Sequence, residues 1–280
     1  MFKTVAEDVW VFDIEWVPDP VTGRRVYDLP ADMPDAAVVD HMFAKGGATE
    51  DDPRPFLKTV LCRVVSICVL KRTATRSHPV RLELVSRPAA GDAALDEATL
   101  ISRFLEDVGK TKPQLVGFNI RGADIPILVQ RAMALGITAP GFCKRPDRPW
   151  DGMDYFSNAG DGVVDLMEVF GMRGRGSPSL HELASAAAIP GKLGTSGEQV
   201  LTMWQAGDLG GIVEYNEFDV ISTYLVWLRG AHLAGFLTTS AFQAEERLLE
   251  SVLREWIALG ALHLERYLES WKGHAGMTRA

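Results

Sequence analysis

Apolar and polar residues follow one another in blocks along the chain, and the blocks predict both strands and helices. The first block, Val9 to Trp16, is apolar at nearly every position, as is typical of a central strand buried on both faces. Pro18 and Pro20 come directly after it and predict its end. A polar stretch at 71–79 predicts a hairpin loop between two later strands. In all, five apolar runs predict strands, at residues 9–16, 61–70, 80–85, 114–118 and 163–166.

Other segments carry apolar residues at the three- and four-residue spacing of helices. These are residues 93–108, 125–135, 179–188, 197–206 and 208–229, followed by one or two amphipathic helices between 240 and 271. Residues 18–58 are rich in Pro, Asp and Gly and predict a long, partly irregular insertion. Three strands followed by alternating helices and strands predict an α/β fold. This is also the order of the ribonuclease-H-like fold, a mixed five-stranded sheet flanked by helices.

The length of 280 residues suits one large domain or two small ones. We expect one α/β domain at 1–235, with its insertion at about 18–58, and a C-terminal helical extension at 236–280 packed on the same domain. No apolar run approaches the ~20 residues of a membrane span, and the N-terminus does not resemble a signal peptide. The three cysteines are not closely spaced, so we expect reduced thiols and a cytoplasmic location.

The formal net charge of −8 bears on whether nucleic acid is a partner of this protein. A protein that binds nucleic acid through phosphate attraction alone is basic. Two interpretations therefore remain. Either nucleic acid is not the partner, or the contact is confined to a cleft in which acidic residues hold cations.

The first strand contains two acidic residues, Asp13 and Glu15, in an otherwise apolar run. Because side chains alternate along a strand, both carboxylates are expected on the same face. Two such neighbours repel each other unless a cation lies between them. A solvent-facing pair at the end of the strand is the alternative.

Two further acidic positions carry weaker signals when taken singly. Asp124 stands just before a predicted helix with Pro126 close behind, and by itself this pattern favours a helix N-cap. Tyr215 and Asp219 lie four residues apart in a predicted helix and therefore share a face. A surface Asp beside a partly buried Tyr is the common alternative.

The order of these motifs is more specific than any one of them. Asp-x-Glu in a strand, Asn-x4-Asp before a helix and Tyr-x3-Asp in a late helix resemble the DEDD superfamily of 3′–5′ exonucleases. The resemblance favours the Tyr branch, because the position five residues before Asp219 is Glu214 and not His. The chain is similar to the proofreading exonuclease domain of family-B DNA polymerases, and to predicted stand-alone enzymes of that kind, over about residues 8–229. Asn216 departs from the pattern, where Cys is more usual. The matching segments are Gly117-Phe118-Asn119-Ile120, Asp124-Ile125-Pro126, Arg131-Ala132, Val164-Asp165-Leu166-Met167 and Ile189-Pro190-Gly191-Lys192.

The resemblance implies a metal-dependent 3′–5′ exonuclease acting on single-stranded nucleic acid with a free 3′ end, DNA being favoured, and releasing nucleoside 5′-monophosphates. It implies Asp13, Glu15, Asp124 and Asp219 as ligands of two Mg²⁺ or Mn²⁺ ions, and Tyr215 as the residue that orients the attacking water. An exoribonuclease and a non-catalytic nucleic-acid-binding module of the same fold are the alternatives.

Four further residues are candidates for contact with the substrate. Asn119 is equally well explained as a turn residue or as a contact to the terminal nucleotide. Trp16 and Phe118 flank the acidic motifs and could stack on a base, although core packing is the more common role of such residues. Lys192 is a candidate phosphate contact, with a solvated lysine as the alternative.

Overall fold

A computed structural model describes residues 2–75, 78–89, 95–148, 151–158, 160–171, 176–191, 193–194 and 197–277. Within these residues five strands form one mixed sheet in the spatial order β3-β2-β1-β4-β5. β1 pairs antiparallel with β2, β2 pairs antiparallel with β3, and β4 and β5 continue the sheet in parallel. The strands are β1 (Asp8–Pro18), β2 (Cys62–Thr75), β3 (His78–Arg87), β4 (Gln114–Gly117) and β5 (Val163–Asp165). The prediction of a mixed five-stranded sheet flanked by helices is confirmed.

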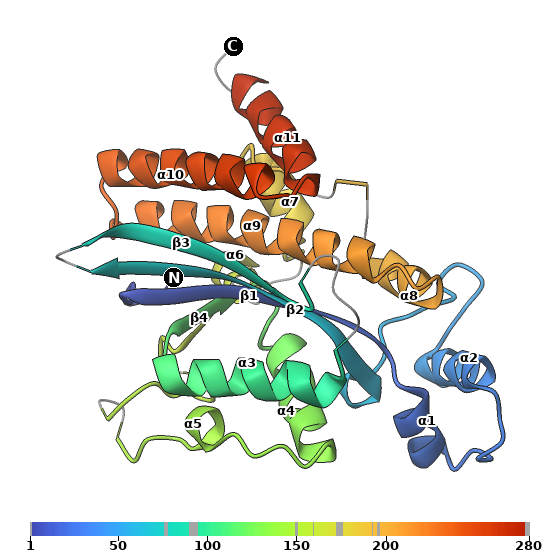
Figure 1. Ribbon diagram of the computed structural model, residues 1–280. Coiled ribbons are helices and arrows are strands. Elements are labelled where there is room, and N and C mark those ends of the chain that lie inside the picture. The colour runs from blue at the N-terminus through green and yellow to red at the C-terminus, as the bar shows by residue number, and fades with distance from the viewer. Residues whose placement is uncertain are drawn as a thin grey trace.

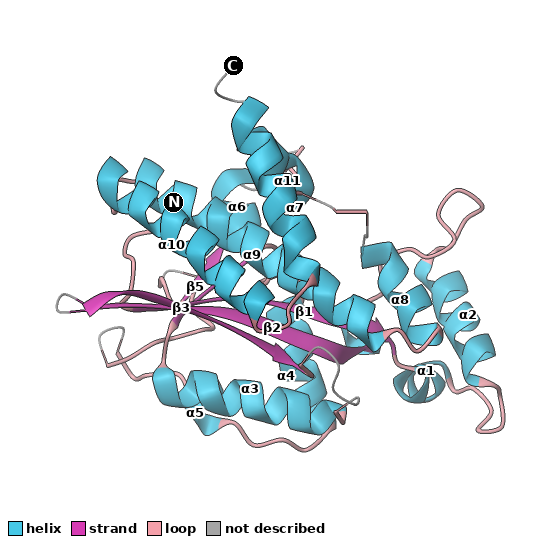
Figure 2. Ribbon diagram, turned by 45° about the horizontal axis from the view of Figure 1, so that its top comes forward, coloured by secondary structure: helices cyan, strands magenta, loops and turns pink. Residues whose placement is uncertain are grey.

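Helices cover both faces of the sheet (Figures 1 and 2). One face carries α9 (Leu209–Leu233) and, above it, α10 (Thr239–Ala258) and α11 (His263–Met277). The other face carries α3 (Glu97–Thr111), α4 (Asp124–Ala134) and α5 (Pro140–Cys143). The shorter helices are α1 (Pro20–Tyr27), α2 (Asp35–Gly46), α6 (Leu166–Gly171), α7 (Leu180–Ala186) and α8 (Gly197–Gln205), with a 3-10 turn at Thr59–Leu61.

The alternation of β1 side chains separates two cores. Val9 and Val11 face α9, whereas Trp10, Phe12 and Ile14 face α3 and α4. This explains why the strand is apolar at almost every position, because both of its faces are covered. α9 is likewise apolar on most of its surface, since it lies between the sheet and the C-terminal helices.

The C-terminal helices are fastened to the sheet by buried polar groups as well as by apolar packing. Arg72 on β2 donates two hydrogen bonds to Glu245 on α10, at 2.5 and 3.0 Å. The Tyr224 hydroxyl of α9 donates to the same carboxylate at 2.5 Å. A buried carboxylate paired in this way leaves neither charge without a partner, which holds α10 in one position over the sheet.

The predicted insertion at 18–58 was expected to be partly irregular, but it contains two helices. Asp19 accepts hydrogen bonds from the backbone N–H groups of Val21 and Thr22, and Pro20 follows at the first helical position. A capping Asp followed by Pro is a strong helix start, so α1 forms where the composition had indicated irregular chain. α2 packs on α1 through the buried side chains of Val38 and Met42.

A buried ion-pair network holds the start of this insertion against the domain. Arg131 on α4 donates to Asp19 at 2.7 Å and, through two nitrogens, to Glu97 on α3 at 2.8 and 2.6 Å. Glu97 also accepts the backbone N–H of Val64. The end of β1 and the beginning of α1 are therefore fixed relative to α3, α4 and β2.

The predicted hairpin loop at 71–79 is too long. β2 continues to Thr75 and β3 begins at His78, so residues 71–75 and 78–79 belong to the strands. Lys71 lies opposite Glu83 in the ladder, and their side chains form an ion pair at 3.5 Å. Polar side chains on the outer part of a sheet can face solvent while the backbone pairing continues, which the hydrophobic pattern does not register.

None of the helices in the described ranges combines the length and the apolar character that a membrane span requires.

Candidate active site

Two carboxylates of the site come from β1. Asp13 and Glu15 follow Val9 and Val11 on the face of the strand that α9 covers, so the prediction that they share a face is confirmed. Glu15 is 6% exposed. The β1–β2 register shifts immediately after Glu15, between Glu15 and Trp16. Such a bulge turns the chain locally, and here it lies next to the acidic pair.

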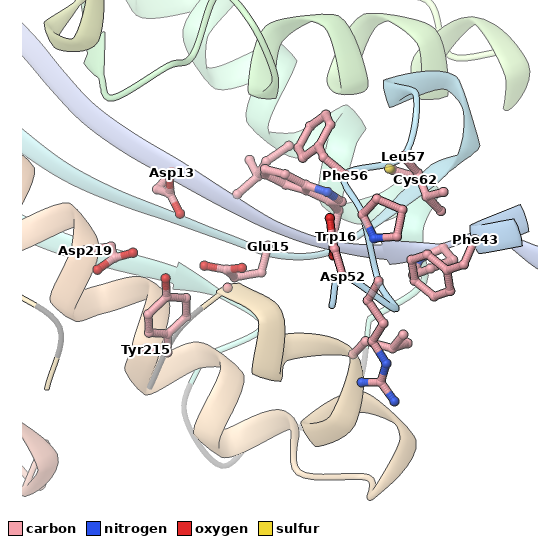
Figure 3. Close-up of a pocket in the computed structure, with 16 residues that line it drawn as sticks. Asp13, Glu15, Trp16, Phe43, Asp52, Phe56, Leu57, Cys62, Tyr215 and Asp219 are labelled. Carbon is pink, nitrogen blue, oxygen red and sulfur yellow. The ribbon is translucent and has the colours of Figure 1, made fainter. Parts of the chain in front are cut away.

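α9 brings Tyr215 and Asp219 to the same place. The two side chains lie one turn apart on the face of α9 that meets β1, and with Asp13 and Glu15 they line one pocket. Figure 3 shows these four side chains gathered at one end of that pocket. The Tyr215 hydroxyl hydrogen-bonds to Asp219, and the pKa of Tyr215 is raised far above its ordinary value by burial and by the neighbouring Asp219 and Glu15 carboxylates. Tyr215 is therefore a protonated hydrogen-bond donor at neutral pH.

Asp124 belongs to α4 on the opposite face of the sheet and does not line the pocket. The alternative interpretation of Asp124 as a helix N-cap is wrong. The cap of α4 is Ala123, and it makes no side-chain capping bond. The Asp124 carboxylate instead accepts the backbone N–H of Ile14 on β1 at 3.1 Å. Because β1 needs a partner for this buried N–H, tertiary contact takes the carboxylate away from its own helix. Burial raises the pKa of Asp124 to about 7, the Ile14 N–H lowers it in part, and Asp165 adds a smaller increase.

The four carboxylates are close enough to alter one another's ionisation. Burial raises the pKa of Asp13 well above its ordinary value, and Asp124, Glu15 and Asp219 raise it further. The pKa of Glu15 is raised by burial and then by Asp219 and Asp124. The Asp13 and Glu15 carboxyl groups are also near enough to share a hydrogen bond when one of them carries a proton. Among the described residues, the charges that perturb Glu15 are all negative, so they add to the repulsion within the cluster.

The chemistry of this donor set fits divalent cations such as Mg²⁺ or Mn²⁺, which prefer carboxylate oxygens. The arrangement is not that of a preassembled cage, because no group of three or more His, Cys, Asp or Glu side chains in the described part of the chain is placed to hold a metal ion. Asp124 is engaged with the β1 backbone, and Asp13 and Glu15 with each other. To bind a cation, Asp13 and Glu15 would have to release any proton that they share and coordinate the metal in its place.

The pocket, of about 450 Å³, has a second end that is rich in aromatic residues. Trp16, Phe43 and Phe56 line this end, away from Asp13 and Asp219, and Asp52 lies beside Trp16. Phe43 belongs to α2 and Phe56 to the segment between α2 and β2, so the insertion forms one wall of the pocket. α8 contributes Leu201 on the side of α9. Sequence reasoning missed Phe43 and Phe56, because nothing near them in the chain marks them as neighbours of the acidic motifs.

The other predicted substrate contacts differ in their surroundings. Trp16 lines the pocket. Phe118 is half-buried against the core beneath α9 and does not line the pocket. Asn119 is a turn residue with φ of 64°, and its backbone N–H donates to the Asp165 carboxylate at 2.9 Å. Lys192 lies outside the described residues.

Comparisons with known proteins give one family and one group of structures. A family described as a predicted 3′–5′ exonuclease related to the exonuclease domain of PolB matches residues 54–271, a span that contains Asp124, Tyr215 and Asp219 but begins after β1. Among solved structures, the family B DNA polymerase from the hyperthermophilic archaeon Pyrobaculum calidifontis is 21% identical, with a TM-score of 0.45. The alignment covers 80% of this chain and 25% of the polymerase, so the chain spans about a quarter of that protein's length. No curated protein sequence matches.

Proposed function

The chain belongs to the family of predicted 3′–5′ exonucleases related to the exonuclease domain of PolB, and from this membership we propose that it is a metal-dependent 3′–5′ exonuclease acting on single-stranded DNA. In the proposed reaction water hydrolyses the phosphodiester bond at the 3′ end, one nucleotide at a time. Each cycle releases a nucleoside 5′-monophosphate and a strand shortened by one residue.

The observation that carries this proposal is a cluster of four carboxylates from three separate elements. Asp124 on α4 and Asp219 on α9 raise the pKa values of Asp13 and Glu15 on β1, and the charges that act on Glu15 among the described residues are negative. Burying carboxylates together destabilises a protein unless something compensates, so such a cluster calls for a function. Two divalent cations, when held by these four residues, would supply the positive charge that stabilises the attacking and leaving oxygens at a phosphate.

The residues of the chain itself perform the remaining tasks. Tyr215 stays protonated at neutral pH, so it positions the attacking water by donating or accepting a hydrogen bond and does not remove its proton. Asp219 holds the Tyr215 hydroxyl in place. Asp124 joins α4 to β1 through the Ile14 N–H, which keeps the two sides of the site together.

The test is degradation of a 5′-labelled single-stranded oligonucleotide in Mg²⁺ or Mn²⁺, with matched DNA and RNA strands. We expect a ladder of products shortened from the 3′ end, and none in EDTA. Asp13→Ala and Asp219→Ala should abolish the ladder while circular dichroism shows an intact fold. Glu255→Ala, which removes an exposed carboxylate on α10, is the matched control and should digest like the unchanged protein.

The two alternatives give different results in the same experiment. Faster loss of the RNA strand would identify an exoribonuclease. Binding of the labelled strand without release of nucleotides would identify a non-catalytic module. Undiminished digestion by purified Asp13→Ala or Asp219→Ala would contradict the assignment of the site.

A further inference from the structure

The aromatic end of the pocket is built largely by the insertion between β1 and β2. Trp16, at the end of β1, is joined there by Phe43 from α2 and by Phe56 from the segment that leads to β2. Figure 3 shows Phe56 beside Trp16 on the side of the pocket away from Tyr215 and Asp219. The pocket therefore has one end with Asp13, Glu15 and Asp219 and one end with three aromatic rings, where Asp52 and Arg54 also line the wall.

Phe56 has an unusual situation for a large apolar side chain. It is 65% exposed, and it meets Trp16 edge to face, with ring centroids 6.2 Å apart and planes at 82°. A single exposed phenylalanine needs no explanation by itself, but this one stands on a pocket wall beside a second ring. The edge-to-face contact leaves ring surface of Phe56 open to the pocket.

The chain is anchored on both sides of Phe56, two residues before it and directly after it, which holds the exposed ring in place. Arg54 donates a hydrogen bond to the Thr202 hydroxyl on α8 at 3.0 Å. Leu57 is 6% exposed and belongs to the core on the α3–α4 face of the sheet. An exposed ring on an anchored segment loses little conformational freedom when a flat ligand stacks on it.

We propose that Phe56, together with Trp16, is a stacking platform for the base of the 3′-terminal nucleotide, an inference that rests on the proposed exonuclease function. A pocket of about 450 Å³ lies in the ~300–1,000 Å³ range of small-ligand sites and suits a single nucleotide. With its base at the aromatic end, the nucleotide presents its phosphate to the carboxylate end. The base must leave its pairing partner to enter, so the insertion selects unpaired 3′ ends and does so without preference for sequence, since every base has a flat face.

The experiment compares two single-stranded DNA substrates that differ only in the last residue, which either carries a base or is abasic. Because stacking on one aromatic ring is lost in Phe56→Ala, KM for the base-bearing strand should rise by about 5- to 100-fold, with a smaller change in kcat. The abasic strand should be digested with nearly the same KM by both proteins. Phe56→Tyr, which keeps the ring, should restore the preference, and Phe56→Leu, which keeps only apolar area, should not.

Binding provides a readout that does not depend on hydrolysis. Fluorescence anisotropy of the two labelled strands on the Asp219→Ala protein should show the same discrimination, and the Phe56→Ala/Asp219→Ala protein should lack it. Met133→Ala removes a comparably exposed apolar side chain on α4 and should leave both assays unchanged. Equal affinity for the two strands before any change at Phe56, or an equal loss for both strands after it, would overturn the platform. A protein that discriminates between the strands in binding but hydrolyses neither would retain the platform and refute the exonuclease proposal.

Discussion

Replacing Asp124 with asparagine should stabilise the metal-free protein at neutral and alkaline pH. Asp124 is 2% exposed, and burial raises its pKa from 3.8 to about 7. Because the folded pKa lies above the unfolded one, the neutral carboxyl is the form that the fold prefers. The contribution of Asp124 to stability is therefore fully present below about pH 4 and is lost as the pH rises through about 7.

The size of the effect follows from the same two pKa values. At about 1.4 kcal/mol per pKa unit, ionisation of Asp124 costs the fold up to about 4 kcal/mol. Asparagine has nearly the same shape, it cannot ionise, and its carbonyl oxygen can still accept the Ile14 N–H. Each kcal/mol recovered should raise Tm by about 2–4 °C in a protein near this size, so we expect a gain of several degrees at about pH 8.

Thermal unfolding followed by circular dichroism in EDTA measures this gain. The difference in Tm between Asp124→Asn and the unchanged protein should be largest at about pH 8 and should shrink toward zero at about pH 4. Asp40→Asn, at an exposed position on α2, is the control and should have no such pH-dependent effect. Added Mn²⁺ should stabilise the unchanged protein more than Asp124→Asn, since one ligand is weakened. A Tm at pH 8 that is equal to or lower than that of the unchanged protein would refute the reasoning.

Three other substitutions test separate parts of the molecule. Tyr215→Phe should lower kcat by about 100-fold with little change in KM, because the ring remains and only the hydroxyl that orients water is lost; equal kcat in steady-state digestion would contradict this role. Glu245→Gln leaves Arg72 charged and buried without its carboxylate, and should lower the free energy of unfolding in urea by about 3–5 kcal/mol; a loss below 1 kcal/mol would mean that the pair is solvated. Gly117→Ala places a Cβ 2.9 Å from the Phe12 carbonyl oxygen at the junction of β4 and β1. It should therefore lower the free energy of unfolding by about 1–3 kcal/mol in the same urea assay. An unchanged unfolding midpoint would show that the two strands can move apart to make room for the methyl group.

The carboxylate positions that local periodicity controls could be predicted from the sequence. Asp13 and Glu15 share a face because a strand alternates its side chains, and Tyr215 and Asp219 share a face because a helix repeats about every four residues. Both statements involve only a few residues of backbone geometry. The mixed five-stranded sheet was predicted in a similar way, from three successive strands and the alternating elements after them.

The contact made by the Asp124 carboxylate could not be predicted from the residues around it in the chain. Its position before a helix with Pro126 behind it is a capping pattern, and the local alternative was reasonable. The structure places its carboxylate on the N–H of Ile14, a residue 110 positions earlier in the chain. A contact over that separation depends on how α4 packs against the sheet, which no local pattern expresses.

The insertion at 18–58 shows the same contrast between what local sequence determines and what tertiary contacts determine. The Asp19-Pro20 pair is a local helix start that could have been recognised, so the existence of α1 was determined by the sequence nearby. The placement of Phe56 against Trp16 was decided only by the tertiary structure, through Arg54 bonded to α8, the buried Leu57 and the Arg131 network at the other end of the insertion. Backbone geometry sets which side chains share a face over one or two turns, whereas the distance between faces is set by packing among elements far apart in the chain. For this reason the sequence alone determined the acidic motifs and their order, and the fold decided that Asp13, Glu15 and Asp219 meet in a pocket with an aromatic wall.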